Sequence, residues 1–157
     1  MRNLGFLGVS ESAREVLSSQ IAIDGPALPA KDPLLFIQSM LSLTLEEYEK
    51  AKSTKGPVYW DRGLPDLIAY AIRFGVDPTE FEEVARRFSF NKAVFIFPPW
   101  KKIFVNDNER RLSFDMSLQF HELVADTYSR LNFNLIEVPL VSPETRAQFI
   151  ADRSKKL

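Results

Sequence analysis

Four short apolar segments, separated by helical patterns, are the feature that most restricts how this chain folds. They are Phe6–Val9, Pro57–Trp60, Ala93–Phe97 and Phe133–Val138. The third is continuous, β-branched and aromatic, which is typical of a strand covered on both faces. Strands that alternate with helices favour a parallel sheet between helical layers. The sequence therefore predicts an α/β fold with a three-layer α/β/α arrangement.

Helix starts are marked by proline and by side chains that cap helices. Asp32-Pro33, Asp77-Pro78 and Ser142-Pro143 each place a capping residue before a proline at the first helical position. Ser12 with Glu15 has the form of a capping box. Helices are predicted to begin at these four points, and the one from Asp32 is expected to continue to about Lys52.

Composition excludes several classes of protein. The 157 residues include no cysteine and one histidine, so disulfides, thiol nucleophiles and cysteine-based zinc sites are excluded. No apolar run approaches the ~18 residues that a membrane span needs. We expect one cytoplasmic domain over residues 1–157, without a membrane partner.

Charge is unevenly distributed along the chain. Residues 1–85 carry 8 basic and 13 acidic side chains, whereas residues 86–157 carry 12 and 8. Within 86–111 there are seven bases and two acids. This stretch suits a phosphate-bearing ligand, and it equally suits a solvated surface. The pI of about 5.9 and the lack of a helix-turn-helix or zinc pattern argue against a nucleic-acid partner.

Candidate site residues follow the predicted strands directly. Ligands of parallel sheets bind at the carboxyl ends of the strands, where Glu11 and Asp61 lie in this sequence. Two carboxylates there can hold Mg²⁺ through water, or one can accept a proton from a hydroxyl. The alternative for Glu11 is structural, because an acid is favoured at a helix N-terminus. Arg62 beside Asp61 suits an anion, and Gly63 permits close approach of a ligand to the backbone.

Arg110 and Arg111 form a second candidate group. They follow a polar loop near the start of a predicted long helix, from which they can reach over a nucleotide and neutralise charge during phosphoryl transfer. The alternative is a solvated helix face.

With these residues laid out, the chain resembles the AAA-domain family of predicted bacterial P-loop ATPases, which is similar to nucleoside and nucleotide kinases. The family has a V-P-E-A-A-R-E-like segment where this sequence has V-S-E-S-A-R-E. Four stretches in family order carry the resemblance, and they are Val9–Glu15, Pro57–Asp66, Phe95–Trp100 and Asn106–Arg111 with Phe114.

The resemblance implies a P-loop kinase-like fold that uses ATP and Mg²⁺, with a nucleotide and a small-molecule acceptor as partners. Catalytic roles are implied for Glu11 near the acceptor, for Asp61 near the acceptor or, through water, the metal, and for Arg110 or Arg111 as lid arginines. Substrate-binding roles are implied for Arg14, Arg62 and Gly63, with Arg62 near phosphate.

The resemblance also implies a segment that these residues do not contain. A first strand and a G-x-x-x-x-G-K-[S/T] loop are expected before Leu4, yet no Gly-Lys pair occurs in the sequence. In the family's strand order, 2-3-1-4-5, that strand is central. Its absence predicts three alternatives: the flanking strands close up, another copy fills the slot in a homo-oligomer, or the chain is a truncated form.

The functional prediction is a P-loop NTPase or small-molecule kinase whose loop is absent here, so that this chain has negligible activity because the phosphate cradle is missing. The alternative prediction is a non-catalytic binding or interaction module that retains the fold.

Overall fold

The computed structural model describes residues 1, 4–105 and 113–157. The chain divides into two compact units, Arg2–Phe88 and Ser89–Leu157, the latter together with Met1. The prediction of a single domain over 1–157 stays a prediction.

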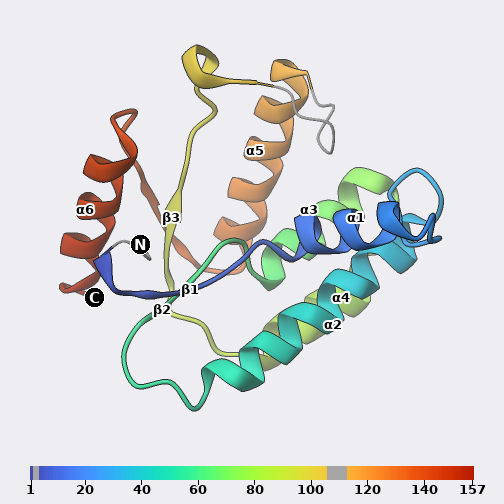
Figure 1. The fold of residues 1–157 in the computed structure, drawn as a ribbon, viewed down its shortest axis with the longest axis horizontal. Coiled ribbons are helices and arrows are strands. Elements are labelled where there is room, and N and C mark those ends of the chain that lie inside the picture. Colours follow the sequence, from blue (N-terminus) through green and yellow to red (C-terminus); the bar gives the residue numbers. More distant parts are fainter. Residues whose placement is uncertain (2–3, 106–112) are drawn as a thin grey trace. The chain divides into compact units, whose positions relative to one another are not determined.

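The described residues of the unit Arg2–Phe88 form two strands and four α-helices (Figure 1). They follow the chain in the order β1 (Leu7–Val9), α1 (Ser12–Ala22), α2 (Pro33–Ala51), β2 (Val58–Trp60), α3 (Leu64–Phe74) and α4 (Thr79–Arg87). β1 and β2 pair in parallel, in the register Leu7↔Val58, Gly8↔Tyr59 and Val9↔Trp60.

The unit Ser89–Leu157 contains β3 (Ala93–Ile96), the 3₁₀ helix η2 (Lys101–Ile103), α5 (Phe114–Arg130), β4 (Asn134–Glu137) and α6 (Pro143–Ser154). β3 and β4 are also parallel, from Ala93↔Asn134 to Ile96↔Glu137.

Strand pairing confirms the parallel α/β prediction. In the described part of the chain the sheets are two parallel ladders of two strands, one within each unit. The three-layer α/β/α arrangement and the strand order 2-3-1-4-5 stay predictions. Because each ladder has only two strands, the residues of β3 are half-buried rather than covered on both faces.

Capping groups explain where several helices begin. The Asp32 carboxylate accepts the Leu35 N–H at 2.9 Å, and Pro33 is the first residue of α2. The Ser142 hydroxyl accepts the Thr145 N–H at 3.3 Å at the start of α6. Both capping predictions are confirmed.

Two predicted caps are shifted by one residue. Glu11, not Ser12, is the N-cap of α1, and its side chain does not cap the helix. Ser12 is the first helical residue instead, and the Thr44 hydroxyl donates to its Oγ at 3.4 Å. Pro78, not Asp77, is the N-cap of α4, although the Asp77 carboxylate still accepts from the backbone of Thr79. The Glu11 side chain is thereby left to interact elsewhere.

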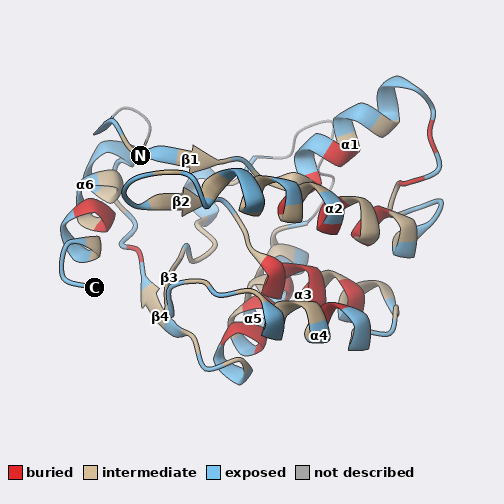
Figure 2. Cartoon of the chain, turned by 90° about the horizontal axis from the view of Figure 1, so that it is seen from below, coloured by how far each residue is buried: buried red, intermediate tan, exposed pale blue. Residues whose placement is uncertain are grey.

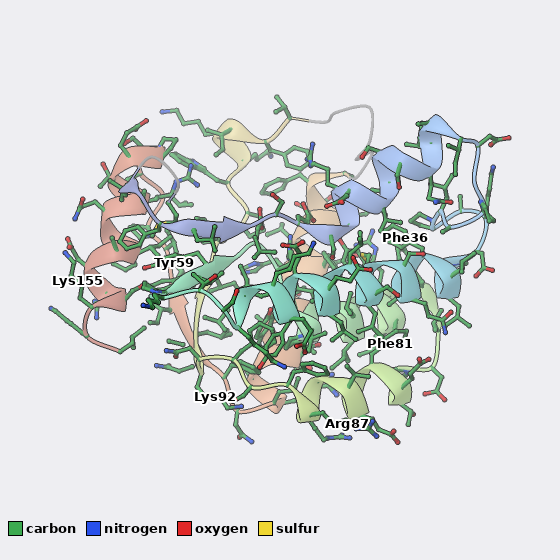
Figure 3. All side chains as sticks on the ribbon, turned by 60° about the horizontal axis from the view of Figure 1, so that its bottom comes forward. Phe36, Tyr59, Phe81, Arg87, Lys92 and Lys155 are labelled. Carbon is green, nitrogen blue, oxygen red and sulfur yellow. The ribbon has the colours of Figure 1, made fainter. Side chains whose placement is uncertain are left out.

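The apolar core of the unit Arg2–Phe88 forms mainly where α2, α3 and α4 pack together. Figure 2 shows buried residues concentrated on α3, and Figure 3 labels Phe36 on α2 and Phe81 on α4, each about 1% exposed. Phe36 also makes edge contacts with the rings of Tyr70 and Phe74. This aromatic packing joins α2 to the second half of α3.

Candidate functional site

The carboxyl ends of β1 and β2 lie at one edge of their ladder. The Asp61 N–H donates to the Val9 carbonyl at 3.0 Å, which extends the pairing by one residue. The chain leaves this edge twice, through Ser10-Glu11 into α1 and through the segment 61–63 into α3. The sequence-predicted residues Glu11 and Arg62 are brought together here.

Arg62 faces two carboxylates. Its Nη1 donates to Oδ1 of Asp66 at 2.9 Å, and its Nε lies 3.8 Å from Oε1 of Glu11. The side chains of Glu11, Arg62 and Asp66 are 11%, 34% and 3% exposed. We call these three residues the strand-end triad. It places one guanidinium between two largely buried carboxylates.

Asp66 accepts hydrogen bonds both from Arg62 and from the backbone of the turn. It occupies the third position of α3, and its Oδ2 accepts the Gly63 N–H at 2.9 Å. One carboxylate therefore satisfies a helix-terminal amide and neutralises Arg62 at the same time. Sequence reasoning missed Asp66, although a signal was present. Asp66 is the one charged residue in the apolar run Leu64–Ala69, so burial of that run buries the acid with it, and a buried acid needs a partner.

The backbone of the turn is left-handed at Arg62, with φ of 77°. A side chain in this region costs about 1–2 kcal/mol. Gly63, whose freedom the sequence singled out, has φ of −144° and is extended, a conformation that any residue adopts. The structure thus assigns the unusual conformation to the residue that carries the charge, where surrounding contacts have to maintain it.

Electrostatics keep Arg62 charged. Burial opposes the charge and lowers its pKa, but the Asp66 carboxylate, followed by Tyr70 and Glu11, outweighs burial and holds the pKa of Arg62 above its ordinary value. The guanidinium is a permanent cation within this edge of the ladder.

The remaining predicted residues have different positions. Asp61 and Arg14 are exposed, at the end of β2 and in the first turn of α1. Arg110 and Arg111 lie outside the described residues. Within the described ranges, no three histidine, cysteine or carboxylate side chains cluster as a metal site.

One comparison with known proteins identifies the family. The model of the AAA domain family matches residues 1–146. The chain belongs to the AAA domain family. Its AAA domain is a nucleotide-binding domain of the P-loop NTPase-like type, as the resemblance predicted. No curated protein and no solved structure matches the chain.

None of the helices in the described part of this AAA domain has the length and apolar character needed to cross a membrane.

Proposed function

We propose that this AAA domain takes part in Mg²⁺-dependent phosphoryl transfer from ATP to a small-molecule acceptor, within a three-layer α/β/α sheet completed by a central strand. The observation that carries the proposal is the strand-end triad, which places a buried carboxylate and a fixed guanidinium at the carboxyl ends of two parallel strands. Ligands of parallel sheets bind at this edge.

Glu11 is proposed to accept the proton of the acceptor. Its carboxylate is nearly buried, and Arg62 lies close enough to orient it. A carboxylate held in this way removes a proton from a hydroxyl as the hydroxyl oxygen bonds to the γ-phosphorus of ATP, while the bond from that phosphorus to the bridging oxygen breaks and ADP leaves. Arg62 is therefore proposed to act on Glu11 rather than on the reacting phosphate.

The exposed Asp61 carboxylate fits Mg²⁺, which proteins usually hold through one or two carboxylates together with waters and substrate phosphates. Bound Mg²⁺ neutralises charge on phosphate oxygens. The same residues fit the triphosphate of ATP less well than they fit Mg²⁺. These 157 residues contain no Gly-Lys pair and so no G-x-x-x-x-G-K loop to hold the phosphates. We propose that this chain alone turns over Mg-ATP at a negligible rate.

The test supplies the loop and then removes the carboxylates. A strand followed by a G-x-x-x-x-G-K-[S/T] loop is joined ahead of Leu4, and Mg-ATP turnover is measured with a panel of hydroxyl acceptors. Glu11→Gln and Asp61→Ala should each lower turnover by about 10²-fold or more. Glu46→Ala, which removes an exposed acid of α2, is the matched control and should leave it unchanged. Equal rates in all four proteins would refute the proposal.

The missing Gly-Lys pair favours a second candidate, a binding module that keeps the fold without the chemistry. Isothermal titration of the unmodified chain with Mg-ATP separates the two. Tight, Mg²⁺-dependent binding would contradict our account of the missing cradle, because backbone amides and the loop lysine are the groups that hold the phosphates.

A further inference from the structure

Arg62 is occupied before any ligand arrives. Its Nη1 is bonded to a carboxylate that is 3% exposed, and its Nε lies beside a second carboxylate that is 11% exposed. The strand-end triad therefore carries a net charge of −1, from two carboxylates and one guanidinium. The only cation of the triad is already neutralised.

The two segments that line this edge are also acidic overall. Residues 10–15 and 61–66 contain four acids, Glu11, Glu15, Asp61 and Asp66, against the two arginines Arg14 and Arg62, which gives −2. A phosphate ester placed against these two segments would meet repulsion, and the exposed Arg14 offers it little in water.

An anion cannot easily recruit Arg62. Removing the partner of a buried ion is strongly unfavourable, and Asp66 is the more buried member of its pair. Asp66 also closes the turn through the Gly63 N–H, so it cannot swing away without loss of that bond. The geometry holds Arg62 between Asp66 and Glu11.

Resting on the proposed function, we infer that Asp66 determines the acceptor class of this AAA domain: by holding Arg62, it makes the site take an uncharged or cationic hydroxyl compound and reject acceptors that carry phosphate. The hydroxyl of such an acceptor would meet the Glu11 carboxylate, which is proposed to accept its proton.

The first test measures the local potential with two nitroxides of similar size, one bearing a trimethylammonium group and one a carboxylate. The nitroxide ratio is the relaxation of an amide proton by the cationic probe divided by its relaxation by the anionic probe. For the Glu11 and Gly63 amide protons this ratio should be at least about three. Amides of α6 are the internal reference and should give a ratio near one, because its acids Glu144 and Asp152 are matched by Arg146 and Arg153. A ratio at or below the α6 reference would overturn the inference.

The second test titrates the unmodified chain with inorganic phosphate while following the Arg62 Nε–H and Gly63 N–H signals. No saturation is expected, and half-saturation below about 1 mM at these signals would contradict the inference. Asp66→Asn, whose amide oxygen can still accept the Gly63 N–H, should strengthen phosphate binding at least tenfold and lower the nitroxide ratio. An unchanged response would exclude Asp66 as the determinant.

Glu11→Gln provides a second variant if Asp66→Asn does not fold, because Glu11 does not cap α1. It should lower the nitroxide ratio, whereas Glu46→Gln on α2 should not. Neither measurement uses ATP or a phosphate loop. A failure of Mg-ATP turnover would therefore refute the proposed function and leave the charge preference standing. A nitroxide ratio at the reference value would refute the charge preference and leave the proposed phosphoryl transfer standing.

Discussion

The ion pair between Arg62 and Asp66 should contribute more to the free energy of unfolding than an exposed pair of the same four-residue spacing does. A double-mutant cycle can measure this contribution. The variants are Arg62→Ala, Asp66→Asn and the double mutant. Asp66→Asn retains an acceptor for the Gly63 N–H, and alanine at position 62 has the same left-handed backbone cost as arginine. The cycle therefore isolates the charge interaction.

The expected magnitude follows from burial. Loss of one partner costs about 3–5 kcal/mol for a buried pair and about 0–1 kcal/mol for an exposed pair. Asp66 is 3% exposed but Arg62 is 34% exposed, which lets water reach one side of the pair. We expect each single mutant to lose about 2–3 kcal/mol, with a coupling energy of about 1.5 kcal/mol.

Urea unfolding in a Trp100→Phe background, followed by Trp60 fluorescence, reports on the unit that holds the pair. The control is the cycle for Arg86 and Glu82 on α4. That pair has the same spacing of four residues and a similar N–O distance, 3.0 Å against 2.9 Å, but its side chains are 60% and 29% exposed. Its coupling should be about 0.3–0.5 kcal/mol. A coupling for Arg62 and Asp66 no larger than this value would refute the reasoning from burial.

Three further predictions concern backbone, core and pH. Arg62→Gly should be about 0.5–1 kcal/mol more stable than Arg62→Ala in urea, since glycine accepts a φ of 77°. Phe36→Ala, at a site 1% exposed, should cost about 3–5 kcal/mol by thermal unfolding, whereas Phe97→Ala, at a site 49% exposed, should cost much less. The Thr79 hydroxyl lowers the pKa of Asp77, so Thr79→Val should raise that pKa in an NMR titration. The resulting loss of stability should be present at neutral pH and vanish as the pH falls below 3.8, because a lowered carboxyl pKa stabilises only the ionised form.

Much of the secondary structure could be predicted because its signals are local. Asp32 and Ser142 cap the helices they were expected to cap, and Gly75 ends α3 in the left-handed conformation with φ of 70°. Such features depend on a few neighbouring residues. The cap of α1 was misplaced because Ser12 has a second use: its hydroxyl bonds to Thr44 on α2, a contact between helices that no local pattern contains.

The site was only partly predictable for the same reason. That Glu11 and Arg62 meet follows from parallel pairing of the two strands they leave. That Arg62 is bound by Asp66 depends on the left-handed turn and on the depth of α3 in the core, neither of which periodicity reveals. The roles assigned to the site residues all stay predictions: Glu11, Arg14, Asp61, Arg62, Gly63, Arg110 and Arg111.

The confinement of each ladder to its own unit has a consequence for synthesis on the ribosome. Within residues 4–105 and 113–157, the strand partners of β1 are Val58 to Trp60, which precede residue 89. At 5–20 residues per second, translation of the 69 residues from 89 to 157 takes roughly 3–14 s. Mixed α/β segments fold faster than this. The nascent chain can therefore close its first ladder and bury Asp66 while the second is still being translated, and protease resistance of ribosome-stalled chains would report whether it does.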